Sequence, residues 1–374
     1  MAYQNVGTPR FYISYGDWFK SMGDEIPRYQ TISPYETGSI EFTYGDDWYF
    51  YPPPGYPSSS SSLVGCNWFG ALNHDRGTVT SVSTGSPVIS DYYDYTCLFK
   101  QTPYPYSTLP TPEAGHNVTY VTDINMRNLQ HKGFSLATFS PAFTDLNTTI
   151  AVYTGVGLTS QTGQFNNYAH GHLNIACWVY GATYDVPHSP DLELTMTREI
   201  DGVKRIRTKG GADLVDHKYT KPAMWGDAGA WELYSGNPTN QDLSRSGRRA
   251  WDLSFSYLQD SDLFPVSELN SDGFGIYSSG SILTDPGEYE QYVDYSVLSG
   301  GESVTAQDLM GGNSFYNQVI HKTNGGQLPF IFQPDKNNNN SDSFAICKFD
   351  MDSFEFDQVA NGVYNIKLKI REVW

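Results

Sequence analysis

Residues Pro329–Trp374, PFIFQPDKNNNNSDSFAICKFDMDSFEFDQVANGVYNIKLKIREVW, carry the clearest structural pattern in the chain. Near the end of this stretch, apolar and polar side chains alternate, which is typical of a half-buried β-strand. The apolar positions are Tyr364, Ile366, Leu368 and Ile370, and the polar ones are Asn365, Lys367, Lys369 and Arg371. A strand in this position must pair within a sheet to stay ordered. We therefore expect an edge or closing strand of a β-domain.

The composition of the 374-residue chain also favours β-structure. Aromatic residues make up 15%, with 28 Tyr and 20 Phe, and such side chains suit pleated, half-buried surfaces. The 35 Gly and 21 Pro indicate many turns and few long helices. The length allows a large core in two or three packed units. We predict an all-β fold with a minor helix.

The charge of the chain argues against nucleic-acid binding. The sequence holds 41 acidic and 23 basic residues, a formal net charge of -18. Proteins that neutralise phosphates need a basic face, so we expect no sequence-specific nucleic-acid binding. No segment approaches the roughly 18 apolar residues of a membrane helix, and the first residues lack the pattern of a secretory leader. We expect no membrane span.

The cysteines indicate a reducing compartment. Their positions are Cys66, Cys97, Cys177 and Cys347. This spacing fits neither paired zinc ligands nor a dense disulfide framework. We predict four reduced, mostly buried thiols.

Residues 1–115 predict an irregular, aromatic-rich N-terminal region or arm. The segments Tyr51–Pro57 (YPPPGYP) and Ser58–Ser62 are typical of loops or flexible linkers. Short strands are indicated only around Phe11 and Ile40. An arm that packs on a neighbouring molecule would explain apolar rings in loop-rich sequence, because exposed apolar loops otherwise favour aggregation.

Residues 116–374 predict an antiparallel β-sandwich region of one or two sandwiches, with closing strands at 329–374. Short alternating strands separated by turn signals such as Gly210-Gly211 are typical of this architecture. The expected inward positions are Leu173, Ile175, Cys177 and Val179, then Leu192, Leu194 and Met196, then Trp251, Leu253, Phe255 and Tyr257.

One helix is predicted just before the last strands. Ser314 is a suitable cap, and Phe315, Val319 and Ile320 share a face. Asn324–Gly326 is a suitable helix end.

No sequence motif indicates an enzyme, a cofactor or a metal. GxSxG, HExxH, P-loop and GxGxxG patterns in their proper context do not occur. His170-Gly-His172 places two imidazoles on one strand face, but no third ligand follows at a recognisable spacing. The acid–histidine groups Asp213, Asp216 with His217, and His74 with Asp75, suit solvated turns better than acid–base pairs.

Basic residues are concentrated between residues 198 and 249, which contain ten of the 23 in the chain. A solvated strand face is the simplest explanation. A basic patch that meets an acidic patch on a neighbouring subunit is favoured modestly, because such complementarity sets register. The candidate interface residues are Lys204, Arg205, Arg207, Arg248, Arg249, Lys367, Lys369, Arg371 and Trp374.

Tyrosine-rich loops offer a second kind of contact. Aromatic faces suit sugar rings, but they also suit ordinary packing and interface filling, which we favour. The candidate glycan contacts are Tyr92, Tyr93, Tyr95, Tyr104 and Tyr106.

Five stretches together resemble structural proteins of tailed bacteriophages, especially marine phages. They are 186–194 (VPHSPDLEL), 202–211 (GVKRIRTKGG), 247–255 (GRRAWDLSF), 323–332 (TNGGQLPFIF) and 363–372 (VYNIKLKIRE). The last two are similar to the closing part of distal-tail and tail-tube domains.

The resemblance implies a β-sandwich of the phage tail type and a structural role in the virion. Such proteins form rings, often hexamers, that link the tail tube to the adsorption apparatus and let DNA pass. The implied partners are copies of the chain itself and other tail proteins (tube, hub, fibre). The implied location is the virion tail, after synthesis in the bacterial cytoplasm. Alternatives are a carbohydrate- or receptor-binding module of the tail, a capsid-associated decoration protein or, third, a glycan depolymerase.

Overall fold

A computed structural model gives the fold of most strand-forming segments of the chain. The described residues are 6–21, 26, 30–32, 40–42, 47–50, 66–74, 96–101, 117–123, 133–140, 148–153, 173–192, 194–199, 203–217, 248–264, 314–339 and 343–373.

The described elements are mainly strands, which confirms the all-β prediction with minor helix. The strands before the middle of the chain are β1 (Arg10–Ser14), β2 (Ile40–Phe42), β3 (Asp47–Phe50), β4 (Trp68–His74), β5 (Thr96–Gln101), β6 (Asn117–Asp123), β7 (Gly133–Ser140), β8 (Thr148–Tyr153) and β9 (Leu173–Asp185). The later strands are β10 (Thr195–Glu199), β11 (Val203–Arg207), β12 (Asp213–His217), β13 (Arg248–Gln259), β14 (Phe330–Gln333), β15 (Ala345–Phe349), β16 (Phe356–Ala360) and β17 (Val363–Glu372). The helices are α1 (Tyr15–Ser21), α2 (Asp260–Leu263) and the π-helix η4 (Tyr316–His321).

Within the described residues, twelve strands form one antiparallel sheet. Its order is β10-β13-β17-β15-β14-β1-β9-β4-β7-β6, with β16 paired to β17 and β2 paired to β9. β3, β8 and β5 form a separate sheet, and β11 pairs with β12 alone. Most neighbours in the large sheet are distant in the sequence.

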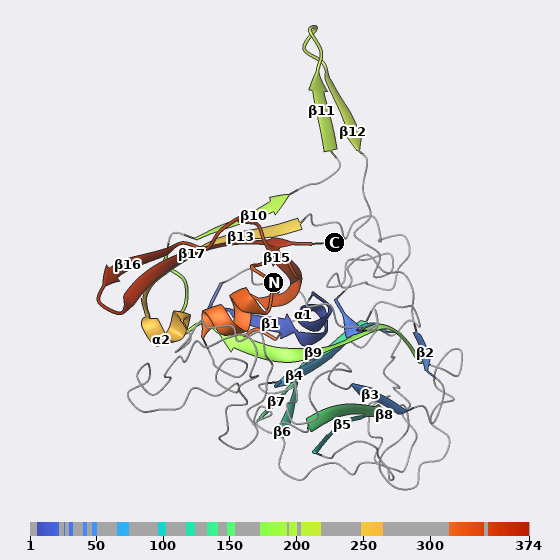
Figure 1. The fold of residues 1–374 in the computed structure, drawn as a ribbon. Helices are drawn as coiled ribbons and strands as arrows, with labels where there is room; N and C mark the ends of the chain where they lie inside the picture. Colours follow the sequence, from blue (N-terminus) through green and yellow to red (C-terminus); the bar gives the residue numbers. More distant parts are fainter. Residues whose placement is uncertain are drawn as a thin grey trace, which may run out of the picture.

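The large sheet curls so that its parts face each other (Figure 1). β17 and β15 lie between β13 and β14, which would separate the outer two by about 14 Å in a flat sheet. The ring centroids of Trp251 on β13 and Phe332 on β14 nevertheless lie only 5.2 Å apart. Farther along the sheet, the Tyr184 hydroxyl of β9 donates a hydrogen bond to the Asp262 carbonyl, just after β13, at 3.0 Å. The curled strands therefore enclose a common core.

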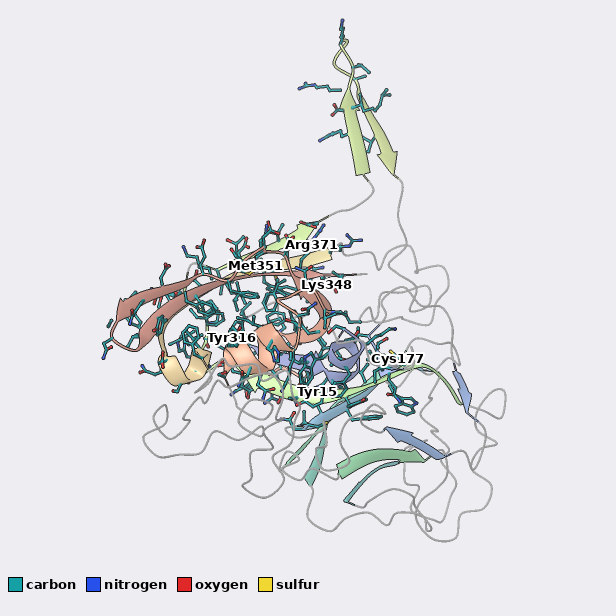
Figure 2. All side chains as sticks on the ribbon, viewed as in Figure 1. Tyr15, Cys177, Tyr316, Lys348, Met351 and Arg371 are labelled. Atoms are coloured by element: carbon teal, nitrogen blue, oxygen red, sulfur yellow. The ribbon has the colours of Figure 1, made fainter. Side chains whose placement is uncertain are left out.

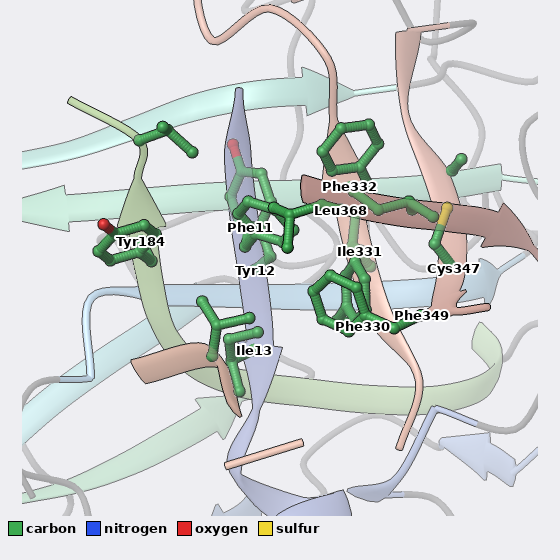
Figure 3. Close-up of a cluster of buried hydrophobic side chains, with 14 of the residues drawn as sticks. Phe11, Tyr12, Ile13, Tyr184, Phe330, Ile331, Phe332, Cys347, Phe349 and Leu368 are labelled. Carbon is green, nitrogen blue, oxygen red and sulfur yellow. The ribbon is translucent and has the colours of Figure 1, made fainter. Parts of the chain in front are cut away.

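Aromatic side chains fill this core (Figure 3). Phe11 is fully buried, and its ring centroid lies 5.4 Å from that of Phe330 and 5.3 Å from that of Phe332. Phe349 of β15 lies 4.8 Å from Phe330, centroid to centroid. In the described part of the chain, many of the aromatic residues therefore pack in the core.

The faces of β17 were predicted correctly, but its position was not. Ile366, Leu368 and Ile370 are buried, whereas Lys367 and Lys369 are exposed. An edge or closing strand was expected, yet β17 pairs with β13 on one side and with β15 and β16 on the other. It is an internal strand, because both of its edges are paired.

The first strand is part of the central sheet. Residues 1–115 were expected to form an irregular arm, although a short strand around Phe11 was indicated. β1 lies between β14 and β9 and pairs with both. β1 therefore belongs to the large sheet and not to a separate arm, because both of its edges are occupied by β9 and β14.

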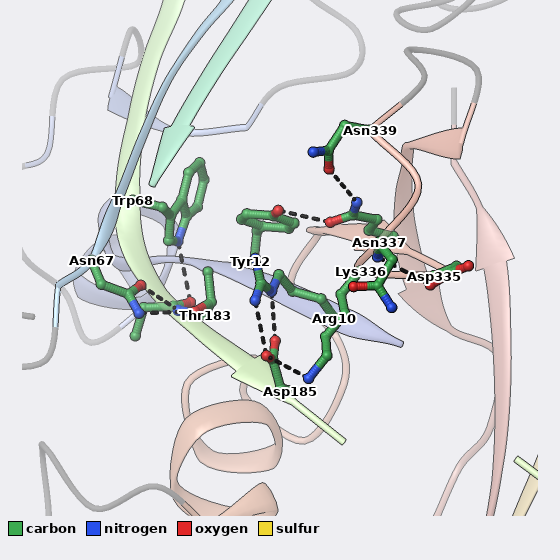
Figure 4. Close-up of polar contacts among 12 residues, drawn as sticks. Arg10, Tyr12, Asn67, Trp68, Thr183, Asp185, Asp335, Lys336, Asn337 and Asn339 are labelled. Carbon is green, nitrogen blue, oxygen red and sulfur yellow. Dashed lines mark hydrogen bonds and ion pairs between the residues drawn. The ribbon is translucent and has the colours of Figure 1, made fainter. Parts of the chain in front are cut away.

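Polar contacts fix the register of β1 (Figure 4). Arg10 forms an ion pair with Asp185 on β9, with Nη2 and Oδ2 2.9 Å apart, and Lys336 binds the same carboxylate at 3.3 Å. Burial alone would raise the pKa of Asp185, but the hydrogen bonds from Arg10 and the two cations lower it. On the other side, the Tyr12 hydroxyl donates to Gln333 Oε1 at 2.8 Å.

The strand predictions for β9 and β13 were right in type but wrong in detail. β9 was expected to alternate, yet Cys177, Trp178, Val179 and Tyr180 are all buried. On β13, Trp251, Leu253 and Phe255 are buried as expected, but Tyr257 is 74% exposed. The pairing with β17 shifts between Phe255 and Leu258. This β-bulge turns Tyr257 outward and Leu258 inward.

The predicted β10 strand was wrong at its beginning. Leu192 was expected to face inward, but its side chain is 101% exposed. Met196 packs against the core as expected. The strand itself begins only at Thr195, so Leu192 lies in the preceding connection.

The predicted helix is present as a π-helix. The Ser314 hydroxyl accepts a hydrogen bond from the Asn317 amide at 3.2 Å, which confirms the cap. Phe315, Val319 and Ile320 are buried. The Gly325 amide donates to the Ile320 carbonyl at 2.9 Å and closes the end.

Candidate assembly surface

The hairpin of β11 and β12 stands apart from the large sheet (Figure 1). Thr208 closes its turn, since the Thr208 amide donates to the Ala212 carbonyl at 2.8 Å and the Ala212 amide donates to Thr208 Oγ1 at 3.0 Å. Gly211 has a φ of 84°, a conformation that favours glycine. This confirms the turn predicted at Gly210-Gly211.

The side chains of this hairpin lie away from the body of the molecule (Figure 2), and its large apolar ones are exposed to solvent. Ile206 is 50% exposed, and its cross-strand partner Leu214 is 58% exposed. Val215, opposite Arg205, is 42% exposed. A two-stranded hairpin alone is marginally stable in water, and contiguous exposed apolar groups mark interaction sites. The hairpin therefore has the properties of a contact element.

The hairpin is also the basic part of an acidic chain. Residues 203–217 contain four basic residues (Lys204, Arg205, Arg207, Lys209) and two acidic ones (Asp213, Asp216), a formal charge of +2. Arg205 pairs with Asp213 at 3.0 Å, but both side chains are well exposed, so the pair adds little stability. Arg207 and Lys209 are exposed, and the side chain of Lys204 lies outside the described part.

Two of the candidate interface residues on β17, Lys369 and Arg371, form ion pairs within the chain. Arg371 binds Glu199 of β10, with Nε and Oε2 2.8 Å apart. Lys369 lies 3.3 Å from Asp350, Nζ to Oδ2. Lys367 is exposed, and no ion pair is found for it among the described residues. Arg248 is half-buried.

Arg249 is a buried residue of the large sheet, and not the exposed interface residue that was predicted. Its side chain is 9% exposed and that of its partner Glu372 is 7% exposed. Arg249 Nη2 lies 3.0 Å from Glu372 Oε1 and donates to the Phe344 carbonyl at 2.6 Å. The guanidinium also lies 5.4 Å from the centroid of the Trp251 ring. These contacts join β13, β17 and the start of β15.

Several sequence candidates lie outside the described residues. They are Tyr92, Tyr93, Tyr95, Tyr104, Tyr106, His170, His172 and Trp374. Three of the four cysteines, at positions 66, 177 and 347, are buried thiols, as predicted. In the part of the chain that the structure covers, no group of three metal-binding side chains occurs, and no helix there has the length and apolar character to cross a membrane.

A buried lysine that was not expected lies between α1 and η4. Lys322 is 1% exposed, and its Nζ donates to Gln318 Oε1 at 2.7 Å and to the Tyr15 hydroxyl at 3.2 Å. The ammonium lies 4.9 Å from the ring centroid of Tyr15 and 5.6 Å from that of Trp18. Burial lowers the pKa of Lys322 to about 7, because the charged form loses its hydration.

Replacing Lys322 with methionine should flatten the dependence of stability on pH above neutrality. The folded pKa of about 7 lies below the unfolded value of 10.5, so the unfolded chain binds more protons between these values. Stability therefore rises with pH in this window, by up to about 1.4 kcal/mol per pH unit. Urea unfolding of both proteins at pH 7.0 and 8.5 measures this slope.

The chosen pH window separates Lys322 from other buried groups. Burial raises the pKa of Asp17 from 3.8 to about 7. The pH dependence of stability that comes from Asp17 therefore lies mainly between these two values. Burial raises the pKa of Cys66 to about 12, so Cys66 affects stability only above about pH 9. Exposed Lys367→Met is the matched control, and it should keep the wild-type slope. An equal slope in Lys322→Met would contradict the expected role.

Comparisons with known proteins place the chain in no group. No protein-family model matches it, and neither a curated protein nor a solved structure does so.

Proposed function

We propose that the chain is a structural virion protein of a tailed phage that forms an oligomeric ring at the distal tail. In this role it links the tail tube to the adsorption apparatus and lets DNA pass. The fold is a β-sandwich of the tail type. The protein acts by assembly, and its excess of negative charge repels DNA phosphates in the ring lumen instead of binding them.

The hairpin of β11 and β12 is the observation that supports this proposal most strongly. Its exposed Ile206, Leu214 and Val215 need a partner surface, and its sheet contains no strand from the body of the molecule. The phage-like stretches 202–211, 247–255, 323–332 and 363–372 coincide with the hairpin, β13, β14 and β17. The stretches that resemble phage proteins therefore lie in the exposed β11–β12 hairpin and in strands of the large sheet.

The oligomeric state of the purified full chain tests the proposal. Light scattering and negative-stain imaging should show closed rings, and mass spectrometry should find the chain in virions of the phage that encodes it. A monodisperse monomer that is also missing from those particles would refute the role.

Replacing Ile206 and Leu214 with serine should weaken self-association at least about tenfold, because two apolar side chains lose their burial in the contact. Sedimentation velocity over a concentration series measures the change. The thermal unfolding of the body, measured at a dilution at which both proteins are monomeric, should stay the same, since the hairpin does not belong to the large sheet. Leu192→Ser, at a fully exposed apolar position outside the hairpin, is the control and should assemble normally. Unchanged association of the double variant would mean that the hairpin makes no contact.

A further inference from the structure

A second surface of the molecule complements the hairpin in charge. The connection from β15 into β16, residues 350–357, has the sequence DMDSFEFD. Its four carboxylates are exposed, whereas Met351, Phe354 and Phe356 pack against the core. The Phe354 ring lies 5.1 Å from Phe349 and the Phe356 ring 4.9 Å from Phe264, measured between centroids. The apolar residues thus fix the backbone in a position that presents the carboxylates outward.

Three of these carboxylates have no ion pair among the described residues. Asp350 pairs with Lys369 at 3.3 Å. Asp352, Glu355 and Asp357 are exposed, and none of them forms an ion pair within the described residues. The exposed Lys367 follows Ile366, the cross-strand partner of Phe356, on the neighbouring strand. A cationic partner would therefore meet three available charges.

Exposed apolar groups border the same carboxylates. Tyr257 lies at the β13 bulge with a φ of 63°, and its amide donates to Asn365 Oδ1 at 3.1 Å. Asn365 on β17 is the cross-strand partner of Asp357 on β16. Val359, two residues beyond Asp357, is 49% exposed. Bulges commonly redirect a side chain in this way.

The large apolar side chains that are exposed in the described residues gather on two surfaces. Three of the six belong to the hairpin, and two more, Tyr257 and Val359, border the carboxylates; Leu192 is the sixth. One surface thus combines apolar groups with cations, and the other combines apolar groups with anions. We name the second surface the acidic face, formed by Tyr257, Asp352, Glu355, Asp357 and Val359.

We propose that the β11–β12 hairpin of one copy docks on the acidic face of a second copy of the chain. This inference rests on the proposed function and names the contact through which the ring forms. Arg205 and Arg207 share one face of the hairpin with Val215, the cross-strand partner of Arg205. Arg205, Arg207 and Lys209 meet the three carboxylates, and Val215 contacts Tyr257 and Val359. The second copy also covers Ile206 and Leu214 on the opposite face of the hairpin. Charge complementarity sets the register and speeds association.

The two surfaces consist of different residues, so the contact is heterologous. Each copy offers one hairpin and one acidic face, and the hairpin lies apart from β16 (Figure 1). A repeated heterologous contact closes into a ring when its rotation permits, and otherwise continues as a filament. This arrangement distinguishes the proposal from an isologous dimer, in which one patch would meet itself.

Charge exchange between two variants tests the contact. The first variant carries Arg205→Glu and Arg207→Glu, and the second carries Asp352→Lys and Glu355→Lys. Each alone should associate at least about tenfold more weakly than the wild type, because like charges now face each other. An equimolar mixture, and a single chain with all four changes, should recover assembly. Recovery also shows that both variants fold.

A photocrosslinker at position 215, on the hairpin face that carries Arg205 and Arg207, tests the same contact independently of charge. Mass spectrometry should find it joined to residues 350–359 of another copy. If the wild type assembles but charge exchange fails to restore assembly and the crosslink falls elsewhere, the docking is overturned and ring formation stands. A monomeric wild type that is also missing from the virions overturns the proposed function itself.

Discussion

Replacing Arg249 with methionine should lower the free energy of unfolding by about 3–5 kcal/mol. The substitution leaves the Glu372 carboxylate buried without its cation, and it removes the hydrogen bond from Nη2 to the Phe344 carbonyl. An uncompensated buried charge costs far more than the net value of the pair. Urea unfolding, followed by tryptophan fluorescence, measures the loss as a lower midpoint at constant slope.

The double replacement of Arg249 and Glu372 with methionine is the informative control. It removes both charges together and fills similar volume, so most of the lost stability should return. Arg207→Met, an exposed arginine of the hairpin, should change stability by no more than about 0.5 kcal/mol. A small loss in Arg249→Met would mean that the guanidinium is hydrated, as expected of an interface residue.

The alternation on β13 contained the information needed to place Arg249. Trp251, Leu253 and Phe255 were correctly assigned to the inner face, and Arg249 is two residues before Trp251. On β17 the same period assigns Glu372 to the inner face with Ile370. Charge alone cannot distinguish a buried pair from a surface patch, which is why Arg249 appears among the candidate interface residues.

Strand types could be predicted because they depend on local pattern, whereas sheet positions could not. The two faces of β17 follow from its alternation, but its neighbours β13 and β15 are set by long-range pairing. Tyr257 shows a second limit, because a bulge adds one residue and reverses the alternation beyond it.

The hairpin could be predicted only in part. Its basic residues and its turn at Gly210-Gly211 were evident in the sequence. The exposure of Ile206 and Leu214 was not, because an apolar residue in an alternating strand ordinarily faces a core.

The buried Lys322 could not be predicted, since nothing in a lysine next to a predicted helix end distinguishes a buried ammonium from a solvated one.

Replacing Phe11 with alanine should lower the free energy of unfolding by about 3–5 kcal/mol, the range typical of a buried aromatic side chain. Phe11 is fully buried, and its ring contacts those of Tyr184, Phe315, Phe330, Phe332 and Phe349. Its removal leaves a cavity at the point where β1 joins β9 to β14. Unfolding should be measured in the Ile206→Ser, Leu214→Ser background, because self-association would otherwise add to the apparent stability.

Leu192→Ala is the matched control for Phe11→Ala, since its fully exposed side chain leaves no cavity and the change should stay within about 0.5 kcal/mol. The shape of the transition is as informative as the midpoint. β1 joins segments near residues 181–185 and 330–333, so weakening it weakens the whole sheet. Phe11→Ala should therefore unfold in one cooperative step at lower urea. A separate early transition with an unchanged main midpoint is the behaviour of a detachable N-terminal arm, and it would contradict the role of β1 in the core.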